Sequence, residues 1–241
     1  INTIKKELEE TGYMVNQTRM WFASHFSFRD KEEWNRSEDY MFQHLVDGSR
    51  FANRLGWHWV MGSQTGKVYG FSKFQVQKRA KSLCDECELN FNCPINKWPE
   101  NIEITKKNIE VSTDINENFG PQEIKTGNKN PEFVWITAES LGDDDPAMKY
   151  FSDIPVVFIF DQKLLNSLKL STKRINFLLD CLKEISLKRD LTVLLDDPLI
   201  YLKNKLFAST FAPVPKYKKI TKIHKPNFEF PASRLVQPID F

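Results

Sequence analysis

The chain has 241 residues, of which 41% are hydrophobic and 27% charged, a balance typical of soluble globular proteins with one large or two small domains. The formal net charge of +2 neither requires nor forbids a nucleic-acid partner, because a local basic patch would matter more than the total. No apolar run approaches the roughly 20 residues needed to span a bilayer and no signal peptide is visible, so we expect a cytoplasmic protein without a membrane partner.

The first part of the chain, residues 1–100, has the apolar spacing of helices and no convincing strand alternation. Apolar residues recur every three or four positions over residues 1–28, with an interruption at Gly12. A further helix is predicted over residues 38–62, where apolar and aromatic side chains occupy several faces. These patterns predict an all-helical domain over residues 1–100.

The second part of the chain changes character twice. Residues 101–130 are rich in Asn, Lys, Glu, Thr and Gly, which predicts a linker or a surface excursion. Strand and helix patterns then alternate over residues 131–212: a strand at 133–137, a helix at 145–151, a strand at 154–160, a helix at 173–188 and a strand at 191–195. This order predicts a small three-stranded parallel α/β unit with right-handed crossovers.

The last segment, residues 213–241, is rich in Pro and has little periodicity, which predicts an extended tail lying on the surface. It contains a basic run that could contact phosphates, although such runs are more often simply solvated. The lysines of this run are Lys216, Lys218, Lys219, Lys222 and Lys225.

Two segments of the helical part combine unusual residues in a fixed register. They are GYMVNQTRMWFAS at 12–24 and, after Trp34, FQHLVDGSRFANRLGWHWVMG at 42–62. Their order and spacing resemble the FAD-binding domain of the photolyase/cryptochrome family, with no gap between Asn16 and Trp57. The resemblance implies an FAD-binding protein that contains the carboxy-terminal part of that helical domain.

The same resemblance implies which residues contact the cofactor. They are Asn16, Arg19, Asp47, Gly48, Ser49 and Asn53. Arg19 and Asp47 would form an ion pair over the flavin, and Asn53 would face flavin N5. A charged donor and a polar amide near the ring set the redox state of a reduced flavin. The family usually has Asp-Gly-Asp where this sequence has Asp-Gly-Ser, which removes one carboxylate at Ser49.

Two tryptophans align with the flavin-proximal members of the family's electron-transfer chain, Trp57 and Trp34. Closely spaced indoles can pass an electron hole outwards from an excited flavin. Trp21 and Trp59 do not match these positions and are interpreted as packing residues. Taken singly, a Trp more often belongs to a core and an Asp-Gly pair to a turn. The functional interpretation therefore depends on the common register of all these residues.

Three cysteines form a compact motif, in which Cys84-x-x-Cys87 is followed after five residues by Cys93-Pro94. Its position after the flavin-like segments resembles the iron–sulfur branch of bacterial photolyases, which implies a 4Fe–4S cluster with a fourth ligand from elsewhere. A zinc site completed by another side chain and unmetallated thiols are the alternatives. Cys181, on the apolar side of a predicted helix, is interpreted as a small buried hydrophobic residue.

The α/β part also resembles this family. The segment PEFVWITAESLGDDDPAMKYFSDIPVVFIFD at 131–161 and residues 174–185 are similar to the start of the photolyase antenna domain, including an Asp-Pro helix start at Asp145. The Arg-rich turn of that domain is replaced by TAES at 137–140. An unrelated small α/β unit is the alternative interpretation.

These features favour a photolyase/cryptochrome-related FAD protein with light-driven electron transfer for DNA repair, a deoxyribodipyrimidine photolyase-like lyase. Damaged DNA would be its partner, and a second chain or an upstream segment would complete the FAD pocket. A blue-light flavoprotein without repair activity and a cofactor-free interaction scaffold are the alternatives. A metal-dependent nucleic-acid binder is a weaker hypothesis.

Overall fold

The computed structural model describes residues 1–30, 33–98 and 120–232, which fall into two compact units. The first unit contains the described residues up to 98 together with 170–174, and the second contains the remaining described residues. Most of the predicted linker and the end of the predicted tail, residues 101–119 and 233–241, lie outside the described residues.

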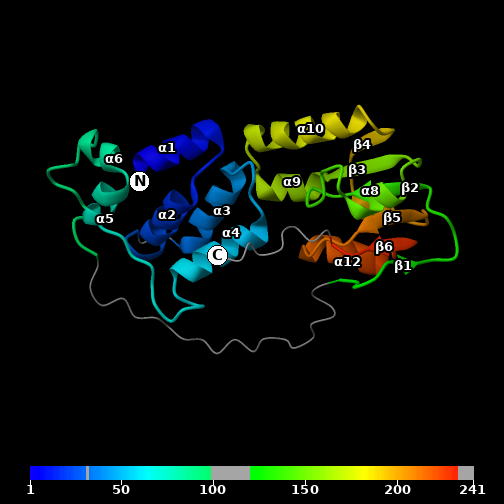
Figure 1. Ribbon diagram of the computed structural model, residues 1–241, viewed down its shortest axis with the longest axis horizontal. Coiled ribbons are helices and arrows are strands. Elements are labelled where there is room, and N and C mark those ends of the chain that lie inside the picture. Colours follow the sequence, from blue (N-terminus) through cyan, green and yellow to red (C-terminus); the bar gives the residue numbers. More distant parts are fainter. Residues whose placement is uncertain (31–32, 99–119, 233–241) are drawn as a thin grey trace. The chain divides into compact units, whose positions relative to one another are not determined.

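The described part of the first unit consists of helices joined by turns and loops (Figure 1). The helices are α1 (Asn2–Thr11), α2 (Asn16–Phe28), α3 (Trp34–His44), α4 (Arg50–Val60), α5 (Lys73–Arg79) and α6 (Lys81–Asp85). The predicted interruption at Gly12 is confirmed, because this residue ends α1 with a left-handed backbone at φ 73°.

The single helix predicted over residues 38–62 is wrong, since the chain leaves the helix between His44 and Arg50. Leu45, which is fully buried, turns to an extended backbone, and the Val46 amide donates to the Gly12 carbonyl at 2.9 Å. A Cβ at Gly12 would lie 2.7 Å from Val46 Cγ1, so glycine permits this close approach. The break therefore depends on a contact with the end of α1 that helical periodicity does not reveal.

The core of the first unit is aromatic. Trp21, Phe22, Trp57 and Phe71 are all buried, and the rings of Trp21 and Phe71 stack with centroids 5.7 Å apart. Burying each such side chain contributes about 2 kcal/mol. These contacts hold α2 against the face of α4 that bears Trp57.

The second unit is built on a mixed six-stranded sheet in the order β1-β6-β5-β2-β3-β4 (Figure 1). The strands are β1 (Lys125–Thr126), β2 (Phe133–Ile136), β3 (Val156–Asp161), β4 (Leu191–Asp196), β5 (Phe207–Thr210) and β6 (Phe228–Phe230). Strands β2, β3 and β4 are the three predicted strands and are parallel, as expected. The predicted total of three is wrong: β5 and β6 continue the parallel order and β1 pairs antiparallel with β6.

Both faces of this sheet are covered, as is usual for parallel strands. Along β2, Val134 and Ile136 belong to one buried cluster, while Phe133 and Trp135 belong to the other. The described helices of this unit are α8 (Pro146–Tyr150), α9 (Gln162–Leu168), α10 (Thr172–Ser186), α11 (Pro198–Tyr201) and α12 (Pro215–Ile223). The helix start predicted at Asp145 is confirmed, because its carboxylate accepts from the Met148 amide at 2.8 Å.

The prediction of an extended tail from residue 213 is wrong in its described part, which contains α12 and β6. Pro215 occupies the first turn of α12, where its missing N–H is no loss. Ile220 is 1% exposed, and the Tyr217 ring contacts Trp135 with centroids 6.0 Å apart. Burial against the sheet therefore stabilises a helix that the Pro content concealed.

Candidate functional site

The first unit contains a cavity of about 220 Å³, walled by α2, α4, the segment between α3 and α4, and the Met41 end of α3. All the residues that the family resemblance implied as cofactor contacts line it: Asn16, Arg19, Asp47, Gly48, Ser49 and Asn53. Trp57 lines the same wall. The structure thus brings together residues up to 41 positions apart in the sequence.

An ion pair lies at this cavity, between α2 and the turn that follows α3. Arg19 Nη2 lies 2.8 Å from Asp47 Oδ2 and 3.1 Å from Asp47 Oδ1, and Arg19 Nε donates to the Met14 carbonyl at 2.7 Å. The two side chains are 26% and 48% exposed, so the pair contributes less than about 1 kcal/mol to stability. Its main effect is to fix a paired charge at the cavity.

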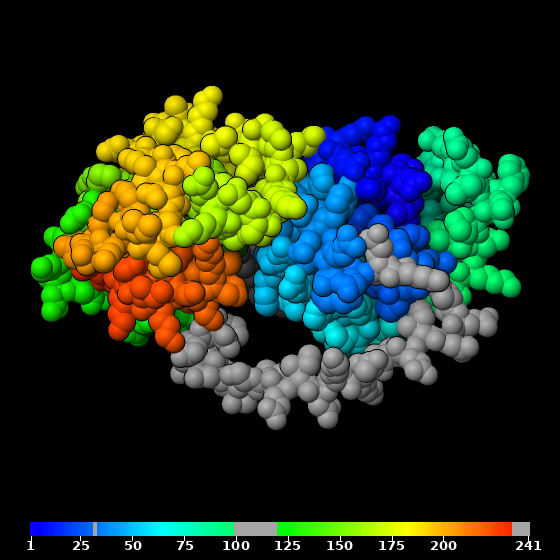
Figure 2. Space-filling view, turned by 180° about the vertical axis from the view of Figure 1, so that it is seen from behind, coloured from blue at the N-terminus to red at the C-terminus, as the bar shows by residue number. Residues whose placement is uncertain are grey.

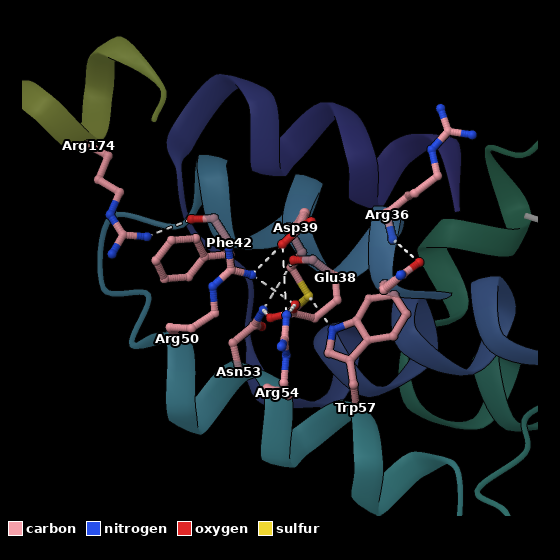
Figure 3. Close-up of polar contacts among 11 residues, drawn as sticks. Arg36, Glu38, Asp39, Phe42, Arg50, Asn53, Arg54, Trp57 and Arg174 are labelled. Atoms are coloured by element: carbon pink, nitrogen blue, oxygen red, sulfur yellow. Dashed lines mark hydrogen bonds and ion pairs between the residues drawn. The ribbon is translucent and has the colours of Figure 1, made fainter. Parts of the chain in front are cut away.

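A buried carboxylate that sequence reasoning missed contacts Asn53, which lines the cavity (Figure 3). The Glu38 side chain is 0% exposed and accepts hydrogen bonds from Arg50 at 2.9 Å, Arg54 at 2.8 Å and Asn53 at 2.7 Å. These three donors come from α4, at spacings of three and four residues, which place them on one helical face. That spacing opposite an acidic residue on α3 is the signal that could have revealed the network.

Glu38 determines how Asn53 is oriented. A carboxylate only accepts, so the group that Asn53 turns towards Glu38 must be its NH2. The Asn53 carbonyl oxygen is then left as an acceptor on a residue that lines the cavity. The network therefore fixes the polarity of this amide.

The two tryptophans implied in electron transfer are neighbours in space. Their ring centroids are 6.4 Å apart with the planes tilted by 35°. Trp57 is 1% exposed, and its indole N–H points at Met41 Sδ at 3.3 Å, whereas Trp34 is half-buried and does not line the cavity. The pair therefore leads from the cavity wall towards the surface of the unit.

The other two tryptophans of residues 12–62, Trp21 and Trp59, lie apart from this pair. Trp21 is 2% exposed in the aromatic core, and Trp59 is 36% exposed with its ring against Tyr69. Neither lines the cavity. Both positions agree with the interpretation of these rings as packing residues.

The structure does not support the predicted metal site. Cys84 is buried on α6, Cys87 is exposed and Cys93 is half-buried. Over residues 1–30, 33–98 and 120–232, no group of three or more His, Cys, Asp or Glu side chains could hold a metal ion. Burial, and then the neighbouring Cys93, raise the pKa of the Cys84 thiol. Neither the iron–sulfur cluster nor the zinc alternative is retained.

The chain thus consists of a helical unit that contains a cavity and a mostly parallel α/β unit. Residues 1–110 match the family described as the FAD-binding domain of DNA photolyase. This part of the chain is therefore similar to the FAD-binding domain of the photolyase/cryptochrome family.

Individual relatives agree with that assignment. The chain is 38% identical over 63 residues to a deoxyribodipyrimidine photo-lyase of Synechococcus sp., covering 26% of this chain and 13% of the relative. It is 30% identical over 89 residues to that of Escherichia coli K12, covering 36% and 19%. The chain thus spans less than one fifth of these relatives. The search of solved structures found no significant match.

Within the described residues, no helix has the length and apolar character needed to cross a membrane. The cytoplasmic location stays a prediction.

Proposed function

We propose that the first unit binds FAD in its cavity and takes part in light-driven electron transfer. This proposal rests on one observation. A charged pair, an oriented amide, the Asp-Gly-Ser turn and a buried indole all line the same cavity. The match of residues 1–110 to a family of FAD-binding domains supports the identity of the ligand.

The size and chemistry of the cavity fit part of this cofactor. Sites for whole cofactors usually enclose about 300–1,000 Å³, so a cavity of about 220 Å³ suits one portion of a dinucleotide such as FAD. The donors and acceptors around it suit the polar edge of a flavin ring. The remaining portion would be held by other residues, supplied by a second chain or by an upstream segment.

Bound FAD supplies light absorption and one-electron transfer. The residues of this chain would orient the ring and control its surroundings. Arg19 and Asp47 would present a fixed pair of charges, and Asn53 would present an acceptor whose direction is set by Glu38. Trp57 and Trp34 would carry an electron between the cavity and the surface, because their rings lie close together.

The proposed substrate is damaged DNA, and the proposed reaction is that of a deoxyribodipyrimidine photolyase-like lyase. The names of the relatives support this choice. A pyrimidine dimer would have to leave the base stack to reach a cavity of this kind. A blue-light flavoprotein without repair activity is the second candidate, favoured by the Asp-Gly-Ser turn, which lacks the second carboxylate usual in the family.

The first experiment is an absorption spectrum of the full chain, purified in the dark without oxygen and incubated with FAD. We expect structured flavin bands that stay with the protein through gel filtration. The substitution Gly56→Leu should remove them, because Gly56 lines the cavity and a Cβ there meets no atom within 4 Å. The matched control is Gly142→Leu, at an equally open position in the second unit.

The outcomes separate the hypotheses. Retention of flavin by the native chain and its loss in Gly56→Leu alone would support the cavity as the site. A native chain that retains no added FAD would contradict FAD binding by this chain on its own. Light-dependent repair of a pyrimidine dimer by the loaded protein would distinguish the lyase from a flavoprotein without repair activity.

A further inference from the structure

A second site candidate lies in the α/β unit, in a groove of about 990 Å³ between α12 and the edge strands β1 and β6. Figure 1 shows α12 beside these strands, and Figure 2 shows residues of α12 and β6, in orange to red, at the surface. The charged residues that line the groove are Lys125, Lys218, Lys219, Lys222, Lys225 and Glu229.

The charge of this groove is unusual for the chain. Five lysines and one glutamate give it a net charge of +4, whereas the whole chain has only +2. Within the groove Lys125 pairs with Glu229 at 3.1 Å, and elsewhere in the same unit Lys163 lies 2.8 Å from Asp197 and Lys188 pairs with Asp143. The groove therefore concentrates positive charge that the rest of the unit balances.

The lysines on α12 and just after it divide according to their partners. Lys216 faces away from the groove and pairs with Asp161 at the end of β3. Lys219, Lys222 and Lys225 are exposed and form no ion pair with any described residue. Charges that the fold does not neutralise are available to an anion in solution.

The spacing of the groove lysines suits a repeating anion. Lys218 and Lys222 lie one helical turn apart, about 6 Å along α12, and Lys225 lines the same groove just beyond the end of this helix. Phosphates repeat along a nucleic-acid strand, so these three lysines can contact about three of them. Thr221 and Asn227 add a hydroxyl and an amide that can donate to phosphate oxygens.

We propose that this groove binds the phosphodiester backbone of a nucleic acid without reading its sequence. Lysine ammonium groups contact phosphates as point charges and carry no base specificity. The site lies in a different unit from the flavin-type cavity, and it requires neither FAD nor light. Its success or failure is therefore independent of the proposed function.

The test is fluorescence anisotropy of labelled, undamaged oligonucleotides with the full chain in the dark, at 50–200 mM salt. We expect a slope of log affinity against log salt near −3 for duplex DNA, from roughly three phosphate contacts at about −0.9 each. The double substitution Lys222→Gln and Lys225→Gln should lower the affinity about tenfold or more and reduce the slope by about 2.

The matched control is the double substitution Lys183→Gln and Lys203→Gln, two exposed lysines of the same unit that do not line the groove. It removes the same net charge, so it should leave affinity and slope nearly unchanged. Circular dichroism should show the native fold in both variants, since Gln is as good a helix former as Lys.

Three results would overturn the proposal: equal loss of binding in the groove and control variants, a salt slope near zero, or equal competition by a mononucleotide at the same phosphate concentration. The last would make the groove a site for small anions. Parallel titrations with single-stranded DNA, duplex DNA and RNA would show which nucleic acid supplies the backbone.

Discussion

Asn53 donates its side-chain amide to the buried carboxylate of Glu38 at 2.7 Å, which joins the wall of the cavity to the ion-pair network behind it. The same carboxylate accepts from Arg50 and Arg54, so one acidic residue orders three side chains of α4. Figure 3 shows this convergence. Because Glu38 is 0% exposed, water cannot replace any of these partners easily.

The first prediction concerns the stability of this network. Glu38→Ala removes the acceptor of two guanidinium groups and one amide, and should lower the free energy of unfolding by about 2 kcal/mol. The arginines are 31% and 47% exposed, which keeps the loss below that of a fully buried pair. Asp39→Ala is the matched control: Asp39 is 48% exposed and contacts the same arginines, so we expect a loss under about 1 kcal/mol. Urea unfolding measures both, and equal losses would contradict the buried role of Glu38.

The second prediction concerns the Arg19–Asp47 pair. Arg19→Gln should change stability by less than about 1 kcal/mol, because the pair is partly exposed. It should nevertheless weaken retention of FAD about tenfold or more, because a charge fixed at the cavity is lost. Flavin titration and thermal unfolding separate the two effects. Arg36→Gln, at an exposed position of α3 away from the cavity, should alter neither.

The third prediction concerns electron transfer. Trp57→Phe should slow photoreduction of bound flavin at least tenfold, since Trp57 alone of the two tryptophans lines the cavity. Trp59→Phe removes an indole from the same helix at a position that packs on Tyr69, and should leave the rate unchanged. Photoreduction kinetics under steady blue light provide the measurement. An unchanged rate in Trp57→Phe would exclude this role.

The fourth prediction concerns pH. Burial lowers the pKa of His25 below its ordinary value, and its Nδ1 has no hydrogen-bond partner among the described residues. The unfolded chain therefore takes up a proton first, at about pH 6.5. The stability that neutral His25 contributes is complete above that pH and is lost as the pH falls below it.

We accordingly expect the melting temperature to fall between pH 7 and pH 5, and His25→Gln to reduce this fall. His224→Gln, in the second unit, controls for the removal of a histidine. Melting curves across the pH range give the measurement, and an identical pH dependence in His25→Gln and the native chain would refute the assignment.

Sequence reasoning recovered the features that local pattern encodes. The strand predicted at 154–160 exists as β3 because a continuous apolar run is buried on both faces of a parallel sheet. The helix predicted at 173–188 exists as α10 because its apolar residues recur on one face. The family resemblance selected the residues that line the cavity, because their register preserves positions that the fold brings together.

Tertiary contacts decided the rest. Strands β1, β5 and β6 contain only two to four residues and lack the continuous apolar run that revealed β2, so they exist through pairing with their neighbours. The turn after Leu45 depends on the carbonyl of Gly12, and the helix α12 depends on burial of Ile220.

The cysteine motif and Glu38 both show that a sequence motif does not determine which side chains meet in the fold. The spacing of Cys84, Cys87 and Cys93 suggested a metal site, but in the described residues their side chains do not form one. Glu38 stands in no motif that we recognised, yet it orders the cavity wall. Sequence by itself determined which residue types recur at which spacing. Only the folded chain decided which side chains lose water and meet, because burial and pairing depend on segments far apart in the sequence.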